Sequence, residues 1–218
     1  MLAFSAETPA VNRKFDFGSG KVATGYTQIL PKMLYSTERG FGFESGATVV
    51  ATDRGGDDAL RGDFLTSDKP FLFSASVPEG NYRVTVTLGD AAGESLTTVK
   101  AESRRLMLEK VQTAAGKFET RTFIVNIRNA KVPPPERNAP GNDHVELNDR
   151  ENGPNGLVYH WDDKLTLEFN NTSPKVCAIE IDRVEVPTVF VLGDSTVTDQ
   201  PREPGASWGQ MLTRFFKP

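Results

Sequence analysis

The sequence predicts a mainly β protein: an antiparallel β-sandwich or jelly roll, followed by the opening strand, loop and helix of an α/β domain. Two observations support the sandwich. Much of the chain consists of short segments in which apolar and polar residues alternate, and Gly, Pro, Asn and Asp turns separate these segments. A third observation, a change of pattern at Pro187, supports the α/β part.

The strand with the clearest pattern spans residues 82–88, where Tyr, Val, Val and Leu alternate with Arg, Thr and Thr between two glycine-containing turns. This period of two places one face in a core and the other in solvent. The same argument predicts further strands over residues 48–52, 71–77, 95–102, 106–112, 120–128, 164–169 and 178–186. In contrast, the segment 132–155 is rich in Pro, Asn and Glu and has few apolar residues, which predicts a long surface loop.

Composition and charge limit the classes of function. The 25 Lys and Arg against 29 Asp and Glu give a net charge of -4, which argues against a nucleic-acid partner. No apolar run is long enough for membrane insertion. The single cysteine, Cys177, excludes an internal disulfide and lies in an apolar run that predicts a buried thiol. With only two histidines, we expect no histidine-rich metal centre and no cofactor, and the sequence assigns no metal ligands. An oxygen-ligand Ca²⁺ site built from loop Asp and Asn residues is left as an alternative.

The pattern changes at Pro187. Residues 188–192 form a continuous apolar run, which is typical of a strand buried on both faces in a parallel sheet. After a Pro/Gly loop, the segment 207–216 has the spacing of a helix. We expect its apolar side, which carries Trp208, Met211, Leu212 and Phe215, to face a core.

The candidate catalytic residues are Gly193, Asp194 and Ser195, which directly follow the predicted buried strand. A serine in this position lies at the carboxyl end of the strand, where α/β enzymes keep their active sites. Gly193 permits a sharp turn there. The Ser195 hydroxyl can act as a nucleophile, and its backbone N–H can help to bind an oxyanion.

The motif Gly-Asp-Ser-Thr-Val at 193–197, followed by Gly-Ala-Ser-Trp-Gly at 205–209, resembles the opening block of the GDSL, or SGNH, hydrolases, and most of all their rhamnogalacturonan acetylesterase branch. The resemblance implies an α/β domain that hydrolyses acetyl esters of pectic polysaccharides, with Ser195 as nucleophile. The other catalytic residues of that family follow the serine, yet no histidine follows Ser195 here. We therefore expect 187–218 to be the truncated start of an SGNH domain, whose catalytic C-terminal portion is missing and which is inactive alone.

The motifs at 14–20, 40–43 and 80–84 resemble those of galactose-binding-like sandwiches attached to pectin-active enzymes. This resemblance implies that residues 11–186 form an accessory domain that binds carbohydrate or acts as a scaffold. Its partner would be a plant cell-wall polysaccharide or oligosaccharide. Such enzymes are usually periplasmic or extracellular, and we expect residues 1–10 to be a disordered tail or the remnant of a signal peptide.

Sugar binding requires an aromatic face for the apolar side of a pyranose and polar groups for its hydroxyls. The candidate residues share such side chains in predicted loops: Tyr35, Phe41, Phe43, Asp53, Arg54, Arg61 and Trp161. The alternative for each aromatic residue is a place in the core, and for each charged residue simple solvation. The alternative for the whole chain is a non-catalytic carbohydrate-binding module.

Overall fold

The computed structural model describes residues 11–132, 144–145, 159–200 and 204–217. The predicted tail at 1–10 and most of the predicted loop at 132–155 lie outside these residues. None of the helices described is long and apolar enough to cross a membrane.

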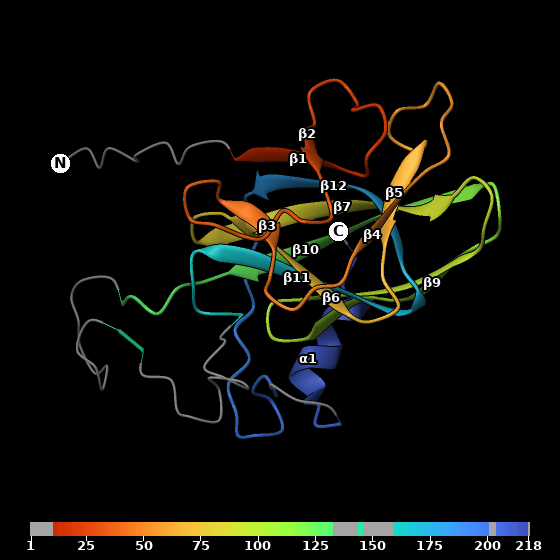
Figure 1. Ribbon diagram of the computed structural model, residues 1–218. Helices are drawn as coiled ribbons and strands as arrows, with labels where there is room; N and C mark the ends of the chain where they lie inside the picture. Colours follow the sequence, from red (N-terminus) through yellow and green to blue (C-terminus); the bar gives the residue numbers. More distant parts are fainter. Residues whose placement is uncertain (1–10, 133–143, 146–158, 201–203, 218) are drawn as a thin grey trace.

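Two sheets face each other as a sandwich (Figure 1). The larger sheet contains, in spatial order, β10 (Lys117–Ile127), β7 (Gly80–Asp90), β12 (Lys175–Val184), β1 (Asn12–Phe17) and β2 (Thr27–Ile29), with β5 (Asp63–Thr66) paired to β12 and β4 (Val50–Asp53) paired to β5. The second sheet contains β3 (Phe41–Phe43), β6 (Phe71–Ser76), β11 (Lys164–Ser173), β8 (Ser95–Ala101) and β9 (Arg105–Thr113). β1 pairs with β2 in parallel, and the other named pairs are antiparallel. The predicted mainly-β sandwich is therefore confirmed.

The core between the sheets contains a cluster of phenylalanine rings. Phe73 of β6 lies at its centre, with ring centroids 4.9 Å from Phe17 and 5.1 Å from Phe15, both on β1. These edge-to-face contacts add to the free energy gained by burying the rings. Cys177 of β12 is fully buried, as predicted, and burial raises the pKa of its thiol, which keeps it unreactive.

The segment after Pro187 departs from its prediction. Residues 188–192 form no strand in the structure, and Val189, Phe190 and Leu192 are 73%, 65% and 93% exposed. An extended segment needs neighbouring strands to satisfy its backbone, and none of the strands described pairs with this one.

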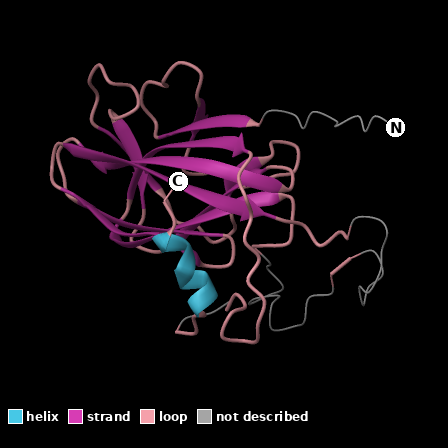
Figure 2. Cartoon of the chain, turned by 180° about the vertical axis from the view of Figure 1, so that it is seen from behind, coloured by secondary structure: helices cyan, strands magenta, loops and turns pink. Residues whose placement is uncertain are grey.

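The helix predicted over 207–216 is shorter than expected. It consists of α1 (Trp208–Leu212) and the 3-10 turn η2 (Thr213–Phe215), and both contact β9 at the bottom of the sandwich (Figures 1 and 2). The predicted core-facing side is wrong, because Trp208 and Phe215 are 51% and 72% exposed while the polar Gln210 is fully buried.

Candidate functional site

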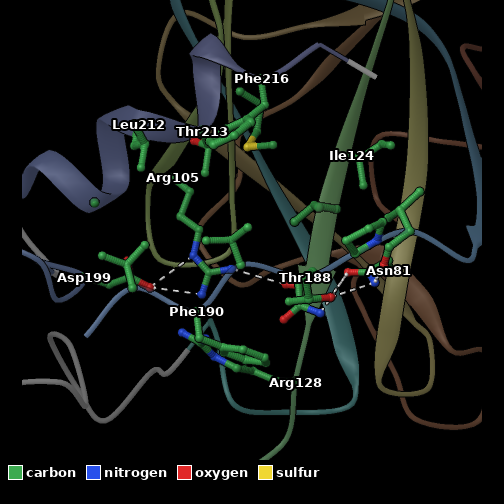
Figure 3. A pocket seen from close by; sticks show the side chains of 18 of the residues that line it. Asn81, Arg105, Ile124, Arg128, Thr188, Phe190, Asp199, Leu212, Thr213 and Phe216 are labelled. Atoms are coloured by element: carbon green, nitrogen blue, oxygen red, sulfur yellow. Dashed lines mark hydrogen bonds and ion pairs between the residues drawn. The ribbon is translucent and has the colours of Figure 1, made fainter.

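A buried polar cluster joins the C-terminal segment to the sandwich. Asp199 Oδ2 accepts hydrogen bonds from Arg105 Nε at 3.3 Å and Nη2 at 3.2 Å, as Figure 3 shows, and lies 3.3 Å from His160 Nδ1. Burial by itself would raise the pKa of Asp199, but the hydrogen bond with His160 and the charge of Arg105 outweigh it and keep this pKa below its usual value. Asp199 is therefore a charged anchor for the segment that carries it. We name Arg105, His160 and Asp199 the junction cluster.

A buried acid lies beside the junction cluster. Glu102, between β8 and β9, accepts a hydrogen bond from the backbone N–H of Thr166 at 3.1 Å. Burial raises its pKa to about 8, although the nearby charge of Arg105 acts in the opposite direction. Burial therefore favours the protonated form of Glu102. Among the residues described, no three His, Cys, Asp or Glu side chains are grouped so that they could hold a metal ion.

Helix α1 is attached to the sandwich by hydrogen bonds. Ser207 caps the helix: its Oγ accepts from the Gln210 N–H, and Gln210 Oε1 accepts from the Ser207 N–H, both at 3.0 Å. Gln210 Nε2 then donates to the carbonyl of Ser103 at 2.6 Å, and Thr213 Oγ1 donates to the carbonyl of Leu106 at 2.7 Å. These directional contacts orient the helix on β9.

A cavity of about 440 Å³ lies between the C-terminal segment and strands β9 and β10 (Figure 3). Its lining is mixed: Met107, Ile124, Phe190 and Phe216 are apolar, whereas Asn81, Arg105 and Arg128 are polar. The Asn81 amide donates to Thr188 Oγ1 at 2.9 Å, which fixes the start of the segment against β7. The cavity has the size and mixed lining of a ligand pocket.

The candidate catalytic residues lie in an exposed turn. Asp194 Oδ1 accepts from the N–H of Thr196 at 2.9 Å and from its hydroxyl at 2.8 Å, and these bonds lower the pKa of Asp194. The carboxylate of Asp194 thus closes the turn. A Cβ at Gly193 would lie 2.5 Å from a methyl of Val197, so the turn requires glycine there. The Ser195 hydroxyl makes no hydrogen bond with any residue described.

The histidine nearest to this segment is not placed to activate Ser195. His160 Nδ1 faces Asp199, and His160 Nε2 is buried without a hydrogen-bond partner among the described residues. A general base must reach the hydroxyl proton directly or through one water molecule. Gln200 Nε2 instead donates to the Ser195 carbonyl at 2.9 Å, which holds the backbone of the turn.

The structure does not bring the predicted sugar-binding residues together. The prediction is wrong for Phe43, because its side chain is fully buried in the core and has no face free for a ligand. Arg54 donates two hydrogen bonds to the buried Asp90, at 3.0 and 3.1 Å, so its guanidinium has a structural partner. Asp53 and Arg61 lie at the ends of the loop between β4 and β5, where Asp53 accepts from the Gly55 N–H at 2.7 Å.

The other predicted aromatic residues remain partly exposed. The ring of Tyr35 lies 4.9 Å from Lys164 Nζ, and Phe41 packs 5.1 Å from Phe15 at the rim of the core. Trp161, whose φ is +59°, carries the Arg128 guanidinium 4.4 Å from its ring and is next to His160 of the junction cluster. Trp161 therefore packs against other side chains and is not a free loop residue.

Sequence reasoning missed the junction cluster and Gln210. Arg105, His160 and Asp199 come from three separate segments, and no motif links them. The signal that remained in the sequence was the capping box, a serine followed three residues later by glutamine at 207 and 210, which marks a helix start.

Comparisons with known proteins identify the sandwich. A family model described as "Beta-agarase/YXIM esterase-like, galactose-binding domain-like" matches residues 13–132, which is more than half of the chain. The chain belongs to this family. It is 26% identical over 210 residues to the "Uncharacterized esterase YxiM" of Bacillus subtilis and 28% identical over 129 residues to "Beta-agarase A" of Zobellia galactanivorans.

The chain spans less than half the length of these relatives. The YxiM match covers 93% of this chain and 47% of YxiM, and the agarase match covers 56% of this chain and 23% of the agarase. The crystal structure of the YxiM protein superposes with a TM-score of 0.51 at 22% identity, over 95% of this chain and 52% of that one. It shows a shared fold. The family-level identification is thus a galactose-binding-like domain with esterase and agarase relatives.

Proposed function

We propose that the chain is the N-terminal portion of a polysaccharide-directed serine esterase of the SGNH kind, close to the rhamnogalacturonan acetylesterase branch. Residues 11–186 form its accessory sandwich and 187–218 the start of its catalytic domain. The observation that carries this proposal is the match to a relative named as an esterase. This match covers 93% of the chain and therefore includes the exposed Ser195 turn. The expected site of action is periplasmic or extracellular.

The turn suits a nucleophile for three reasons. Ser195 is exposed, Asp194 closes the turn on Thr196, and Gln200 holds its backbone. In the proposed reaction Ser195 Oγ attacks the acetyl carbonyl of a pectic glycan, and its own N–H helps to bind the oxyanion. Because His160 is committed to Asp199, the proton passes to a histidine supplied by sequence outside these 218 residues.

Hydrolysis of a generic acetyl ester tests this proposal. The chain is assayed beside the protein encoded by the whole natural reading frame, each with Ser195→Ala and with the control Ser19→Ala, an exposed serine at the opposite end of the sequence. We expect activity in the longer protein, loss of at least about 10³-fold with Ser195→Ala, and full activity with Ser19→Ala. Wild-type activity in Ser195→Ala would contradict the assignment of the nucleophile.

A second candidate function is a non-catalytic carbohydrate-binding module. It is favoured by the family description, which names the same galactose-binding-like domain for both an agarase and an esterase. The agarase match over about half of this chain also favours it. Titration of the chain with agar and pectic oligosaccharides tests it. Saturable binding in a protein whose full-length form hydrolyses no ester would favour this function over the first.

A further inference from the structure

A polar groove lies at the rim of the sandwich, far from the Ser195 turn in sequence. Its volume is about 440 Å³. Its lining includes Asn12, Arg13 and Lys14 of β1, Gly25, which precedes β2, Thr27 of β2, and Phe41 of β3. β1 pairs with β2 only from Phe15 to Phe17. Within the described chain, the edge of β1 that precedes Phe15 is therefore unpaired on this side, and its backbone groups are free to bond a ligand.

Arg13 contributes a cation to this groove that has no ionic partner among the described residues. Its side chain is partly exposed, and it forms no hydrogen bond or ion pair with any residue the structure describes. It is on the same face of β1 as the buried Phe15, so it lies at the open end of the space between the sheets. Gly40 is a neighbour of this side chain: a Cβ there would be 3.8 Å from Arg13 Nη2, an ordinary van der Waals contact.

A second guanidinium lies at the same end of the sandwich. Arg183 of β12 pairs across the strands with Tyr82 of β7, and the charges of Arg183 and Arg13 both act on the Tyr82 hydroxyl. Arg183 Nε and Nη1 have no hydrogen-bond partner among the described residues. The carboxylate nearest to it in the described chain, Glu185, is 3.8 Å from Nε and 89% exposed, so this ion pair is weak.

Paired cations elsewhere in the sandwich make this end unusual. Arg54 and Lys175 both bond Asp90, and Lys164 bonds Glu44, so these three cations have the carboxylate partner that Arg13 lacks among the described residues. Lys14, on the opposite face of β1, pairs with Glu180 at 3.0 Å. A guanidinium that has no such partner is suited to an anionic ligand, because its planar fork matches a carboxylate or sulfate.

We propose that this groove binds an anionic sugar unit of a polysaccharide, with the Arg13 guanidinium on its carboxylate or sulfate and the ring of Phe41 against its apolar face. The site rests on the proposed function in one respect, namely that the substrate is a polysaccharide. The partly exposed Phe41 supplies the stacking surface, and the free edge of β1 supplies backbone donors and acceptors for hydroxyl groups.

Calorimetric titration of the whole chain tests this site. The probes are an oligogalacturonate, a sulfated galacto-oligosaccharide and a neutral galacto-oligosaccharide, each at low and high salt. We expect saturable binding of an anionic probe that weakens with salt, and a loss of about tenfold or more in affinity with Arg13→Gln. The matched control is Arg83→Gln, which removes the same charge from the exposed outer face of β7. The carboxylated and sulfated arms identify which anion is preferred.

Three results would overturn the site. They are the absence of binding to either anionic probe, equal binding of the neutral probe, and equal losses with Arg13→Gln and Arg83→Gln. Thermal unfolding confirms that each variant folds, and Arg13→Lys, which keeps the charge but loses the fork, replaces Arg13→Gln if that variant does not fold; its affinity is expected to be intermediate. Failure of the groove leaves the Ser195 assay unaffected, so the two proposals fail separately.

Discussion

The sandwich and the C-terminal segment are held in place by opposite means. In the sandwich, phenylalanine rings such as Phe73 are buried between two sheets. In the segment, Phe190 and Leu192 are exposed, and the groups that reach the protein interior are the polar Gln210 and Asp199. The sandwich therefore depends on apolar burial, which is large and non-directional, whereas the segment depends on a few oriented hydrogen bonds. The segment should open without unfolding the sandwich.

Removal of an aromatic ring from the core is expected to have the largest effect. Phe73→Ala deletes the ring that touches Phe15, Phe17 and Phe43, and should lower the free energy of unfolding by about 3–5 kcal/mol. The matched control, Phe215→Ala, removes the same ring from a site that is 72% exposed and should change it by less than about 0.5 kcal/mol. Denaturant titration of both variants measures the difference. Equal effects would mean that the segment shares the apolar core.

Loss of the Asp199 carboxylate is expected to act locally. Asp199→Ala leaves Arg105 and His160 without their shared partner. The free energy needed to open the segment should therefore fall by about 1–3 kcal/mol. Hydrogen exchange should accelerate by about 10- to 100-fold in the amides of 207–215 and remain nearly unchanged in β7 and β12. Asp57→Ala, in an exposed loop, should change neither. Uniform acceleration in both regions would show that the segment and the sandwich unfold together.

The sequence pattern identified strands more reliably than sites. All eight segments with alternating residues contain a strand, because alternation is a local property that directly reflects a half-buried sheet. The short strands β1, β2, β3 and β5 were missed by this criterion, although β4 and β6, which also have six residues or fewer, were found. The apolar run at 188–192 misled the prediction because a strand also requires partners, which are not encoded locally.

Site residues were predicted less well for a related reason. Phe43 follows Gly42, which suggested a loop, yet that glycine is needed because a Cβ there would lie 2.6 Å from the backbone of Leu34 while Phe43 itself enters the core. The junction cluster depends on contacts between residues far apart in the chain, such as Arg105 and Asp199. Individual residue types do not reveal such contacts. In the same way, the lack of an ionic partner for Arg13 in the described part of the chain becomes visible only once the partners of the other cations are known.

A pH-dependent effect is expected at Glu102, where the two regions meet. Burial raises its pKa to about 8 in the folded protein, against about 4.5 when unfolded. Between these values the folded state holds a proton that the unfolded state has released, so the contribution of Glu102 to stability falls as the pH rises from 4.5 to 8. Glu102→Gln removes this dependence while keeping an oxygen for the Thr166 N–H.

The variant Glu102→Gln should therefore match the wild type near pH 5 and be more stable near pH 8, by up to a few kcal/mol, because only the wild type must then ionise a buried carboxyl. Thermal unfolding of both proteins across this range measures the difference, and subtraction removes the contribution of Asp63, whose pKa burial raises to about 6 in both. Glu38→Gln, at an exposed site, should show no such trend. A stability difference that is the same at pH 5 and pH 8 would mean that Glu102 is ionised in the folded protein, and that its charge is compensated by Arg105 of the junction cluster.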